Sequence, residues 1–451
     1  MAQKTFSSRR AASRFAVFAA MLCAACHAAG MDFREAYQAA VYNDASIRAS
    51  RAGADAQRER VPQARSQLLP NIAFSGGRNY NELRSETPNI LGQVTRNETT
   101  YFSGSQVLSL RQPLYRPYLT AALRQAKALE KDAEATLARD EQTLVVRVGE
   151  SYFDALLAED QVRLVAAQKE AYEVQLRASK MRFTAGSGTR TDIDEAQALV
   201  DMTYAQELEA RQNVDATRHR LATITGQSVQ ALSTLDEQVF VPVIPVPDSV
   251  DAWIARAEDR SPELTALRAQ LQAADEEVAK AKAGHLPTLD AVAQWSRTNS
   301  DNVTSVRSRY DNRAVGLQLN VPLYSGGYVN STVRQAVASR VRAEEVLEAT
   351  RRDLAVRVRQ EFRGMTEGVV RIRALEQAVR SADQAVLSNR RSFEAGMRTT
   401  VDVLGAEQQR TLALRDLAQA RYRYVVARLR LLALAGEDRD VSVSAVNAWL
   451  K

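Results

Sequence analysis

The chain has 451 residues, of which 25% are charged and only 6% are aromatic, and its formal net charge is +6. This composition is typical of long helices rather than of compact cores rich in aromatic side chains. Four of the positive charges and no acidic residue lie in residues 1–30, so the rest of the chain carries only +2. Such a small surplus excludes the strong basic field of a nucleic-acid-binding protein.

Residues 1–30 have the pattern of a secretory signal peptide. A basic segment ends at Arg14, an apolar run extends from Phe15 to Cys26, and small residues follow at 28–30. The run is too short to span a bilayer. The only cysteines of the chain, Cys23 and Cys26, lie here, so the exported chain would have no thiol chemistry. Acylation of Cys26 is an alternative to simple cleavage, and the cleavage site is left open.

Two proline-free stretches indicate very long helices. No proline occurs between Pro117 and Pro242, and none follows Pro322. Proline interrupts an α-helix because it lacks a backbone N–H group and clashes with the preceding turn. The first of these helices is predicted from about Tyr118 to Phe183, and it would extend about 100 Å.

Each long helix is preceded by the same order of elements. A helical segment, predicted at 33–67 and again at 250–283, ends in Leu-Pro, and two segments of alternating polarity follow it. The alternation is clearest at 315–321, where Val, Leu, Leu and Val are separated by Gly, Gln and Asn. A period of two predicts strands with one apolar face, including strands that face lipid.

The two halves of the chain are copies of one unit at an offset of 210 residues. The motif Phe-x-Ala-Gly-x-x-Thr-x-x-Asp begins at Phe183 and again at Phe393, and Val-Arg-Val at 146–148 recurs at 356–358. The predicted domains are a signal peptide at 1–30, a first repeat at 31–227, a linker at 228–247, a second repeat at 248–437 and a C-terminal tail at 438–451.

The geometry of one repeat predicts an oligomer. One chain cannot bury the apolar stripe of so long a helix. Two strands per repeat give four per chain, too few to close a barrel, whereas three chains supply about twelve. The predicted fold class is therefore an α+β membrane protein. Its tandem-duplicated helical hairpins would pack against each other and against those of other chains, and four strands per chain would contribute to a shared 12-stranded outer-membrane β-barrel.

These features resemble the TolC family of outer-membrane efflux proteins. The most specific are the duplicated turn motif and the sequence Val-Pro-Leu-Tyr-Ser-Gly-Gly at 321–327. The resemblance implies the exit duct of a tripartite efflux pump or type I secretion system, embedded in outer-membrane lipid with its helices in the periplasm. It also implies a homotrimer whose long helical hairpins form a trimeric α-barrel. This trimer would work with a periplasmic adaptor protein and an inner-membrane transporter. A partly helical girdle is implied in the N-terminal, inter-repeat and C-terminal segments.

The resemblance further implies a periplasmic gate at the two helix–helix turns, where polar links hold the tunnel shut. Thr191 and Asp192 occupy link positions of the first repeat, and Arg398 occupies the basic partner position of the second. Asp402 matches an acidic ring that lines the entrance. Phe393 stands where a tyrosine supplies a further link in some members, so that link is missing or replaced here.

A purely structural interpretation of the turns is also open. Asp192 and Asp402 would cap the helices that begin after each turn, and Gly186 and Gly396 would end the preceding helices. Both roles can coexist, since an acidic cap can face the lumen. The passage from strand to helix in the second repeat contains two glycines that permit a sharp turn: Gly326 and Gly327.

The sequence contains no catalytic constellation, and no cofactor or metal site is expected. His219 and His285 lack the spacing of metal ligands, and the glycines at 185–189 lack the lysine of a phosphate-binding loop. An alternative function is a periplasmic coiled-coil structural or adaptor protein that bridges the envelope without a pore. The alternating segments favour the duct, since a coiled coil needs none. The cargo, the identity of the adaptor and transporter, and the effect of Gly405 at an acidic position of the family stay open.

Overall fold

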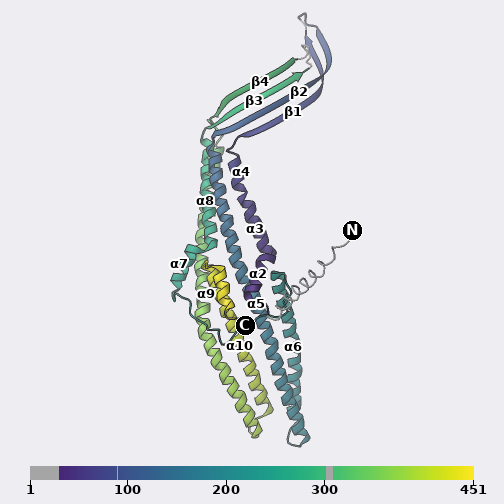
Figure 1. Ribbon diagram of the computed structural model, residues 1–451, viewed down its shortest axis with the longest axis vertical. Helices are drawn as coiled ribbons and strands as arrows, with labels where there is room; N and C mark the ends of the chain where they lie inside the picture. Colours follow the sequence, from purple (N-terminus) through teal and green to yellow (C-terminus); the bar gives the residue numbers. More distant parts are fainter. Residues whose placement is uncertain (1–29, 89, 301–307) are drawn as a thin grey trace, which may run out of the picture. The chain divides into compact units, whose positions relative to one another are not determined.

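The computed structural model describes residues 30–88, 90–300 and 308–451, which form two compact units. One comprises the residues up to Arg51 together with Leu137–Pro262 and Arg351–Lys451, and the other comprises Ala52–Thr136 and Glu263–Thr350. Both repeats contribute to both units, and two long helices continue from one unit into the other (Figure 1). Residues 1–29 of the predicted signal peptide lie outside the described residues.

The described chain is mainly helical (Figure 1). In the first half the helices are α2 (Phe33–Asn43), α3 (Ala45–Arg58), α4 (Arg60–Ser66), α5 (Pro117–Thr184) and α6 (Arg190–Thr225). In the second half they are α7 (Val250–Arg260), α8 (Pro262–Lys282), the 3-10 turn η1 (Ala283–His285), α9 (Tyr328–Glu394), α10 (Thr400–Leu434) and α11 (Arg439–Asn447). The first predicted long helix is confirmed as one element of 68 residues. None of the described helices has an apolar stretch suited to crossing a membrane.

The two shorter helical segments, each predicted as one element, are interrupted in the structure. The segment at 33–67 is divided at Asp44, whose carboxylate accepts a hydrogen bond from the amide of Ile47 at 3.0 Å and so begins a new helix. The segment at 250–283 is divided at Pro262, which has no N–H group to continue the hydrogen-bond pattern of α7.

The four strands form one antiparallel sheet in the order β1-β2-β3-β4. They are β1 (Asn71–Pro88), β2 (Val94–Tyr115), β3 (Thr288–Ser300) and β4 (Ser308–Asn320). The central pair joins the two repeats, with Leu108 opposite Trp295. The expected four strands per chain are thus confirmed, two from each repeat.

The two faces of the sheet differ sharply in polarity. Residues directly opposite one another on antiparallel strands share a face, because side chains alternate along each strand. One face carries the apolar side chains Ile72, Phe74, Leu108, Leu110, Ala293, Trp295, Val315, Leu317 and Leu319. The other is dominated by Ser75, Asn79, Ser103, Ser105, Ser109, Gln294, Ser296, Thr298, Asn312, Gln318 and Asn320. One apolar and one polar face is the pattern of strands placed between lipid and water.

A buried carboxylate fastens the sheet to the helix that follows β2. The side chain of Asp290 is only 3% exposed, and it accepts hydrogen bonds from Arg111 at 2.6 Å and from Arg116 at 2.8 Å. Arg116 lies between β2 and α5, so the three side chains connect the central strands to the start of the long helix. In the second repeat, Gly326 and Gly327 occupy the corresponding passage, with positive φ angles of 60° and 82° that favour glycine.

The core of the first unit, which contains Leu137–Pro262 and Arg351–Lys451, joins segments that are far apart in the sequence. Phe33 of α2 is fully buried against Tyr152 of α5, with ring centroids 5.8 Å apart in an edge-on arrangement. The Tyr152 hydroxyl lies 3.0 Å from the carbonyl oxygen of Met31 and 2.9 Å from that of Ser233. The N-terminal and inter-repeat segments are therefore fixed to the same turn of α5.

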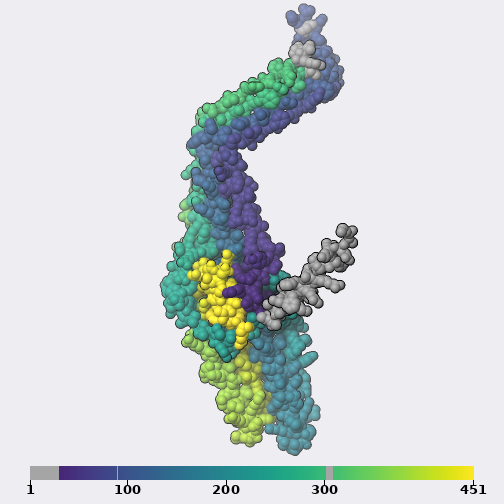
Figure 2. All heavy atoms as spheres, viewed as in Figure 1, coloured from purple at the N-terminus to yellow at the C-terminus, as the bar shows by residue number. Residues whose placement is uncertain are grey.

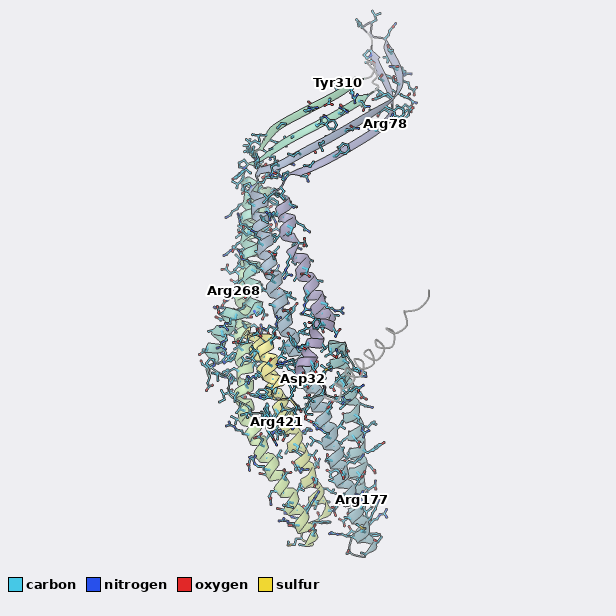
Figure 3. The ribbon with its side chains drawn as sticks, in the orientation of Figure 1. Asp32, Arg78, Arg177, Arg268, Tyr310 and Arg421 are labelled. Carbon is cyan, nitrogen blue, oxygen red and sulfur yellow. The ribbon has the colours of Figure 1, made fainter. Side chains whose placement is uncertain are left out.

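The three segments in which the family resemblance implies a girdle meet in this unit. Single β-bridges pair Met31 with Leu232 and Leu235 with Leu450, so the N-terminal, inter-repeat and C-terminal segments meet. Asp32, labelled in Figure 3, begins α2 and also accepts a hydrogen bond from Asn447 of α11 at 3.1 Å. In Figure 2 the C-terminal residues, in yellow, lie directly beside the purple N-terminal helix.

Candidate functional site at the helix–helix turns

The two helix–helix turns have the same backbone geometry. Gly186 and Gly396 have φ angles of 75° and 77°, in the left-handed region where only glycine is unstrained. The amides of the following residues, Ser187 and Met397, donate to the carbonyl oxygens five residues back at 3.0 Å and 2.9 Å. Each long helix, α5 and α9, therefore ends in a glycine-dependent turn of the type that satisfies its last carbonyl groups.

The two carboxylates of the motif sit in equal capping boxes. The amide of Asp192 donates to the Thr189 hydroxyl at 3.2 Å, and the Thr189 amide donates back to the Asp192 carboxylate at 3.2 Å. Thr399 and Asp402 repeat the arrangement at 3.3 Å and 2.9 Å. The capping geometry considered in the sequence analysis is therefore seen at both turns, where it begins α6 and α10.

Capping also sets the charge of these carboxylates. The Thr189 hydroxyl and amide hold the pKa of Asp192 below its usual range, with a smaller effect from the positive charge of Arg182. The Thr399 amide and hydroxyl lower the pKa of Asp402 in the same way, and Arg398 adds to the effect. Both side chains are therefore ionised at neutral pH.

Four side chains connect the two turns within one chain. The guanidinium carbon of Arg182 lies 3.9 Å from the centroid of the Phe393 ring, a close cation–π contact. The hydroxyl of Thr400, whose side chain is almost fully buried, is close enough to Asp192 to help lower the pKa of its carboxyl group. We call Arg182, Asp192, Phe393 and Thr400 the turn cluster. Arg182 and Thr400 were not predicted from the sequence, although each is adjacent to a residue of the repeated motif.

The other predicted gate residues lie at the surface of the chain. Arg398 lies in the second turn and contacts Asp402 of α10 at 3.4 Å, and its side chain is 56% exposed. Thr191 is exposed, and its side chain forms no hydrogen bond with another described residue. Among the described residues of one chain, no hydrogen bond or ion pair joins Asp192 to Arg398. A link between them would have to form between chains, and it stays a prediction.

The helices behind the turns pack through a small apolar cluster with buried charges beside it. Tyr172, Leu176, Ala196 and Leu404 bring α5, α6 and α10 together. Glu407 of α10 is buried and pairs with Arg390 of α9. Because a buried carboxylate is costly unless it is paired, this contact fixes the register of the second hairpin close to its turn.

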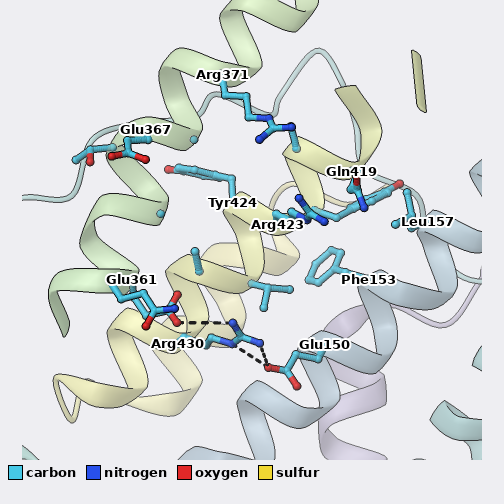
Figure 4. A pocket seen from close by; sticks show the side chains of 18 of the residues that line it. Glu150, Phe153, Leu157, Glu361, Glu367, Arg371, Gln419, Arg423, Tyr424 and Arg430 are labelled. Atoms are coloured by element: carbon cyan, nitrogen blue, oxygen red, sulfur yellow. Dashed lines mark hydrogen bonds and ion pairs between the residues drawn. The ribbon is translucent and has the colours of Figure 1, made fainter. Parts of the chain in front are cut away.

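A hollow of about 1180 Å³ lies among α5, α9 and α10 in the same unit (Figure 4). Arg430 lies between two carboxylates, at 2.6 Å from Glu150 and 3.6 Å from Glu361. Burial raises the pKa of Glu361, and Arg430 partly offsets this effect. These charges pair with one another, so the hollow has the character of a groove between helices rather than of a substrate site.

Comparison with known proteins identifies the family. The family model described as outer membrane efflux protein matches residues 36–227 and 253–437, so the chain belongs to this family. It is 32% identical over 427 residues to the proteases secretion protein PrtF of Dickeya chrysanthemi, covering 94% of this chain and 92% of PrtF. It is 33% identical to the outer membrane protein TolC of Vibrio cholerae, covering 92% of this chain and 93% of TolC.

A solved structure shows the same fold. The CmeC outer membrane channel of Campylobacter jejuni matches with a TM-score of 0.78 at 15% identity, covering 94% of this chain and 90% of CmeC. The chain is thus an outer-membrane export channel protein, which confirms the predicted location and class of function. The family consists of transport proteins rather than enzymes. The alternative of a periplasmic adaptor without a pore finds no support in these relatives.

Proposed function

We propose that three copies of the chain form the exit duct of a type I protein secretion system. The observation that carries this proposal is the similarity, along almost the whole chain, to two proteins named for protease secretion. They are PrtF of Dickeya chrysanthemi, at 32% identity, and AprF of Pseudomonas aeruginosa, at 33%. Drug efflux is the second candidate, because the Brucella suis relative BepC is named an outer membrane efflux protein.

Trimer formation is supported by the free edges of the sheet. Among the described residues of one chain, β1 pairs only with β2 and β4 pairs only with β3, so each has an edge of unpaired backbone groups. Unpaired N–H and C=O groups are not tolerated in hydrocarbon, so strands of other copies must complete the sheet. Three copies would bring about twelve strands, enough to close it.

The long helices also expose apolar side chains that other copies would cover. Met202 and Leu208 of α6 are more than half exposed, as are Val356 and Val370 of α9. Exposed apolar side chains along a helix indicate a partner surface. The helices of three chains would then cover one another's apolar side chains in a ring.

The lining proposed for the duct suits an unfolded chain. The polar face of the sheet would surround the channel, and its many Ser, Thr, Asn and Gln side chains offer hydrogen bonds without fixing a ligand. The sequence contains no nucleotide-binding motif, so the energy would come from an inner-membrane transporter reached through a periplasmic adaptor.

The gate would lie at the turns. The turn cluster holds the two hairpins of one chain together, and Arg398 of one chain would pair with Asp192 of the next. An exposed pair of this kind is worth about 0–1 kcal/mol, so three of them can be overcome when a partner docks. Asp402 from three chains would form an acidic ring that attracts cations and repels anions.

The test is single-channel recording of the purified trimer in a planar bilayer. Wild type should give small cation-selective steps, and Asp192→Ala with Arg398→Ala should give much larger ones. The matched control is Arg177→Ala with Asp194→Ala, which removes the same charges from side chains that pair within their own helices. A trimer that does not conduct would contradict the duct, and equal steps in all three proteins would contradict the gate.

The cargo is tested in a strain that lacks its own outer-membrane duct. The chain is expressed with a type I protease substrate and its transporter, and secreted protease and antibiotic resistance are both measured. Restored protease secretion is the expected result. Restored resistance without secretion would contradict the protein cargo and favour drug efflux.

A further inference from the structure

The apolar face of the sheet carries a group of arginines at one level. Arg313 of β4 is opposite Trp295, and Arg297 of β3 is opposite Asp311. In the next row, Arg309 is opposite Asn299, which is opposite Gly104, which is opposite Arg78 of β1. All four arginines therefore share the face of Phe74 and Leu108. We call them the basic belt: Arg78, Arg297, Arg309 and Arg313.

The basic belt follows directly on the apolar rows of this face. The rows from Leu289 and Leu319 to Phe74 and Trp295 are mainly apolar. The arginines begin in the row of Trp295. This level is at the end of the sheet that carries the β1–β2 and β3–β4 connections, whereas the opposite end leads into α5 and α9. Figure 3 labels Arg78 towards this end of β1. The belt thus borders the lipid-facing band on the side away from the helices.

The positive charge of the belt is mostly uncompensated. Asp311 is the only carboxylate in these rows, and it is occupied by Arg297 at 2.8 Å and by the indole N–H of Trp295 at 3.0 Å. The side chains of Arg309 and Arg313 are exposed, and neither forms a hydrogen bond or close ion pair with the side chain of another described residue. Arg78 stacks on the Phe102 ring, with its guanidinium carbon 5.0 Å from the centroid. Four arginines against one aspartate leave three positive charges per chain at this level.

We propose that the basic belt binds the phosphate groups of an anionic glycolipid in the outer leaflet of the outer membrane. A guanidinium at the border of hydrocarbon is unfavourable unless it reaches water or a counter-ion. Phosphate matches it best, since the planar guanidinium donates two parallel hydrogen bonds to phosphate oxygens. Because the belt borders the apolar band, acyl chains can cover Phe74 and Leu108 while the phosphates meet the arginines. This inference rests on the location of the chain in the outer membrane.

The test compares two lipids that differ only in their phosphates. The trimer in neutral detergent is titrated with bisphosphorylated lipid A and with the same lipid after removal of both phosphates, and bound lipid is counted by native mass spectrometry. Wild type should bind the phosphorylated lipid at least about tenfold more tightly. Equal affinity for the two lipids would overturn the proposal.

The variants locate the site on the sheet. Arg309→Gln with Arg313→Gln should weaken binding of phosphorylated lipid A by about tenfold, and Arg309→Gln alone by less. The matched control is Arg84→Gln with Arg96→Gln, which removes two arginines that pair with glutamates of the same hairpin, beyond the belt. The control should bind as wild type does. Unchanged binding in Arg309→Gln with Arg313→Gln, or an equal loss in the control, would overturn the assignment.

Two further measurements separate this proposal from others. Inorganic phosphate is titrated in place of lipid, and stabilisation of the trimer equal to that by lipid A would overturn the lipid assignment in favour of free phosphate. The belt variants are also recorded in a planar bilayer, where wild-type conductance shows that they fold and assemble. A conducting trimer that ignores lipid phosphates would contradict the belt alone, whereas a wild-type trimer without conductance would contradict the proposed duct.

Discussion

Replacing Arg182 with glutamine tests whether the turn cluster holds the closed state. Arg182 is the one member whose charge serves both hairpins, because it stacks on Phe393 of the second and faces Asp192 of the first. Glutamine keeps much of its length and can still donate hydrogen bonds, but it has no charge to place over the ring. The change therefore removes the attraction between the hairpins and leaves both capping boxes intact.

The size of the effect follows from these two contacts. A partly exposed cation–π contact is worth about 0.5–1 kcal/mol, and a screened charge pair adds about 0–1 kcal/mol. The loss is then about 0.5–2 kcal/mol per chain and about 1.5–6 kcal/mol for three chains. Since 1.4 kcal/mol is about a factor of ten, the ratio of open to closed channels should rise by between about tenfold and about ten-thousandfold.

Single-channel recording measures this ratio, and sensitivity of cells to a large antibiotic reports it in vivo. The control is Arg177→Gln, which removes the same charge from the same helix (Figure 3). Arg177 contacts only Glu173 of its own helix, at 4.0 Å, so it should not change the ratio. If Arg182→Gln and Arg177→Gln behave alike, the turn cluster does not hold the gate.

Two further predictions concern other carboxylates. The pKa values of Asp192 and Asp402 are lowered below their ordinary value of 3.8, so their stabilisation is full above that value and is lost as pH falls through the lower, folded pKa. Channel conductance should therefore be constant between about pH 5 and pH 8 and rise below about pH 4; a rise already near neutral pH would contradict this reasoning. Asp290→Ala should lower the free energy of unfolding by about 2–3 kcal/mol, less than for a fully buried pair because Arg111 and Arg116 can rehydrate, and an unchanged thermal unfolding temperature of the trimer would contradict it.

The sequence predicts those parts of the structure that depend on local patterns. The absence of proline and the repeated motif predict α5, both turns and the capping residues, since these features depend on residues within a few positions of one another. The period of two similarly predicts the strands. The turn cluster could not be found in this way, because α6, β3, β4 and most of α9 lie between Arg182 and Phe393 in the sequence. Their meeting depends on how the hairpins pack. The break at Asp44 was missed because a single carboxylate outweighs the helical pattern around it.

The two turns have the same local geometry but different surroundings, and this difference indicates how a gate can work. Asp192 is held by Thr400 and Arg182 in addition to its own cap, so the first turn is fastened within the chain. Beside its cap, Asp402 pairs among the described residues only with Arg398 of the same turn, and the Arg398 side chain is more than half exposed. In a ring of three chains, the contacts that join neighbours would therefore run from Arg398 of the second turn to Asp192 of the next chain, while the turn cluster joins the two hairpins within each chain. A partner could open the channel at either contact, and the closed state depends on the turn cluster only where the two hairpins of one chain move apart. The prediction for Arg182→Gln matters for this reason, because it distinguishes opening between chains from opening within one.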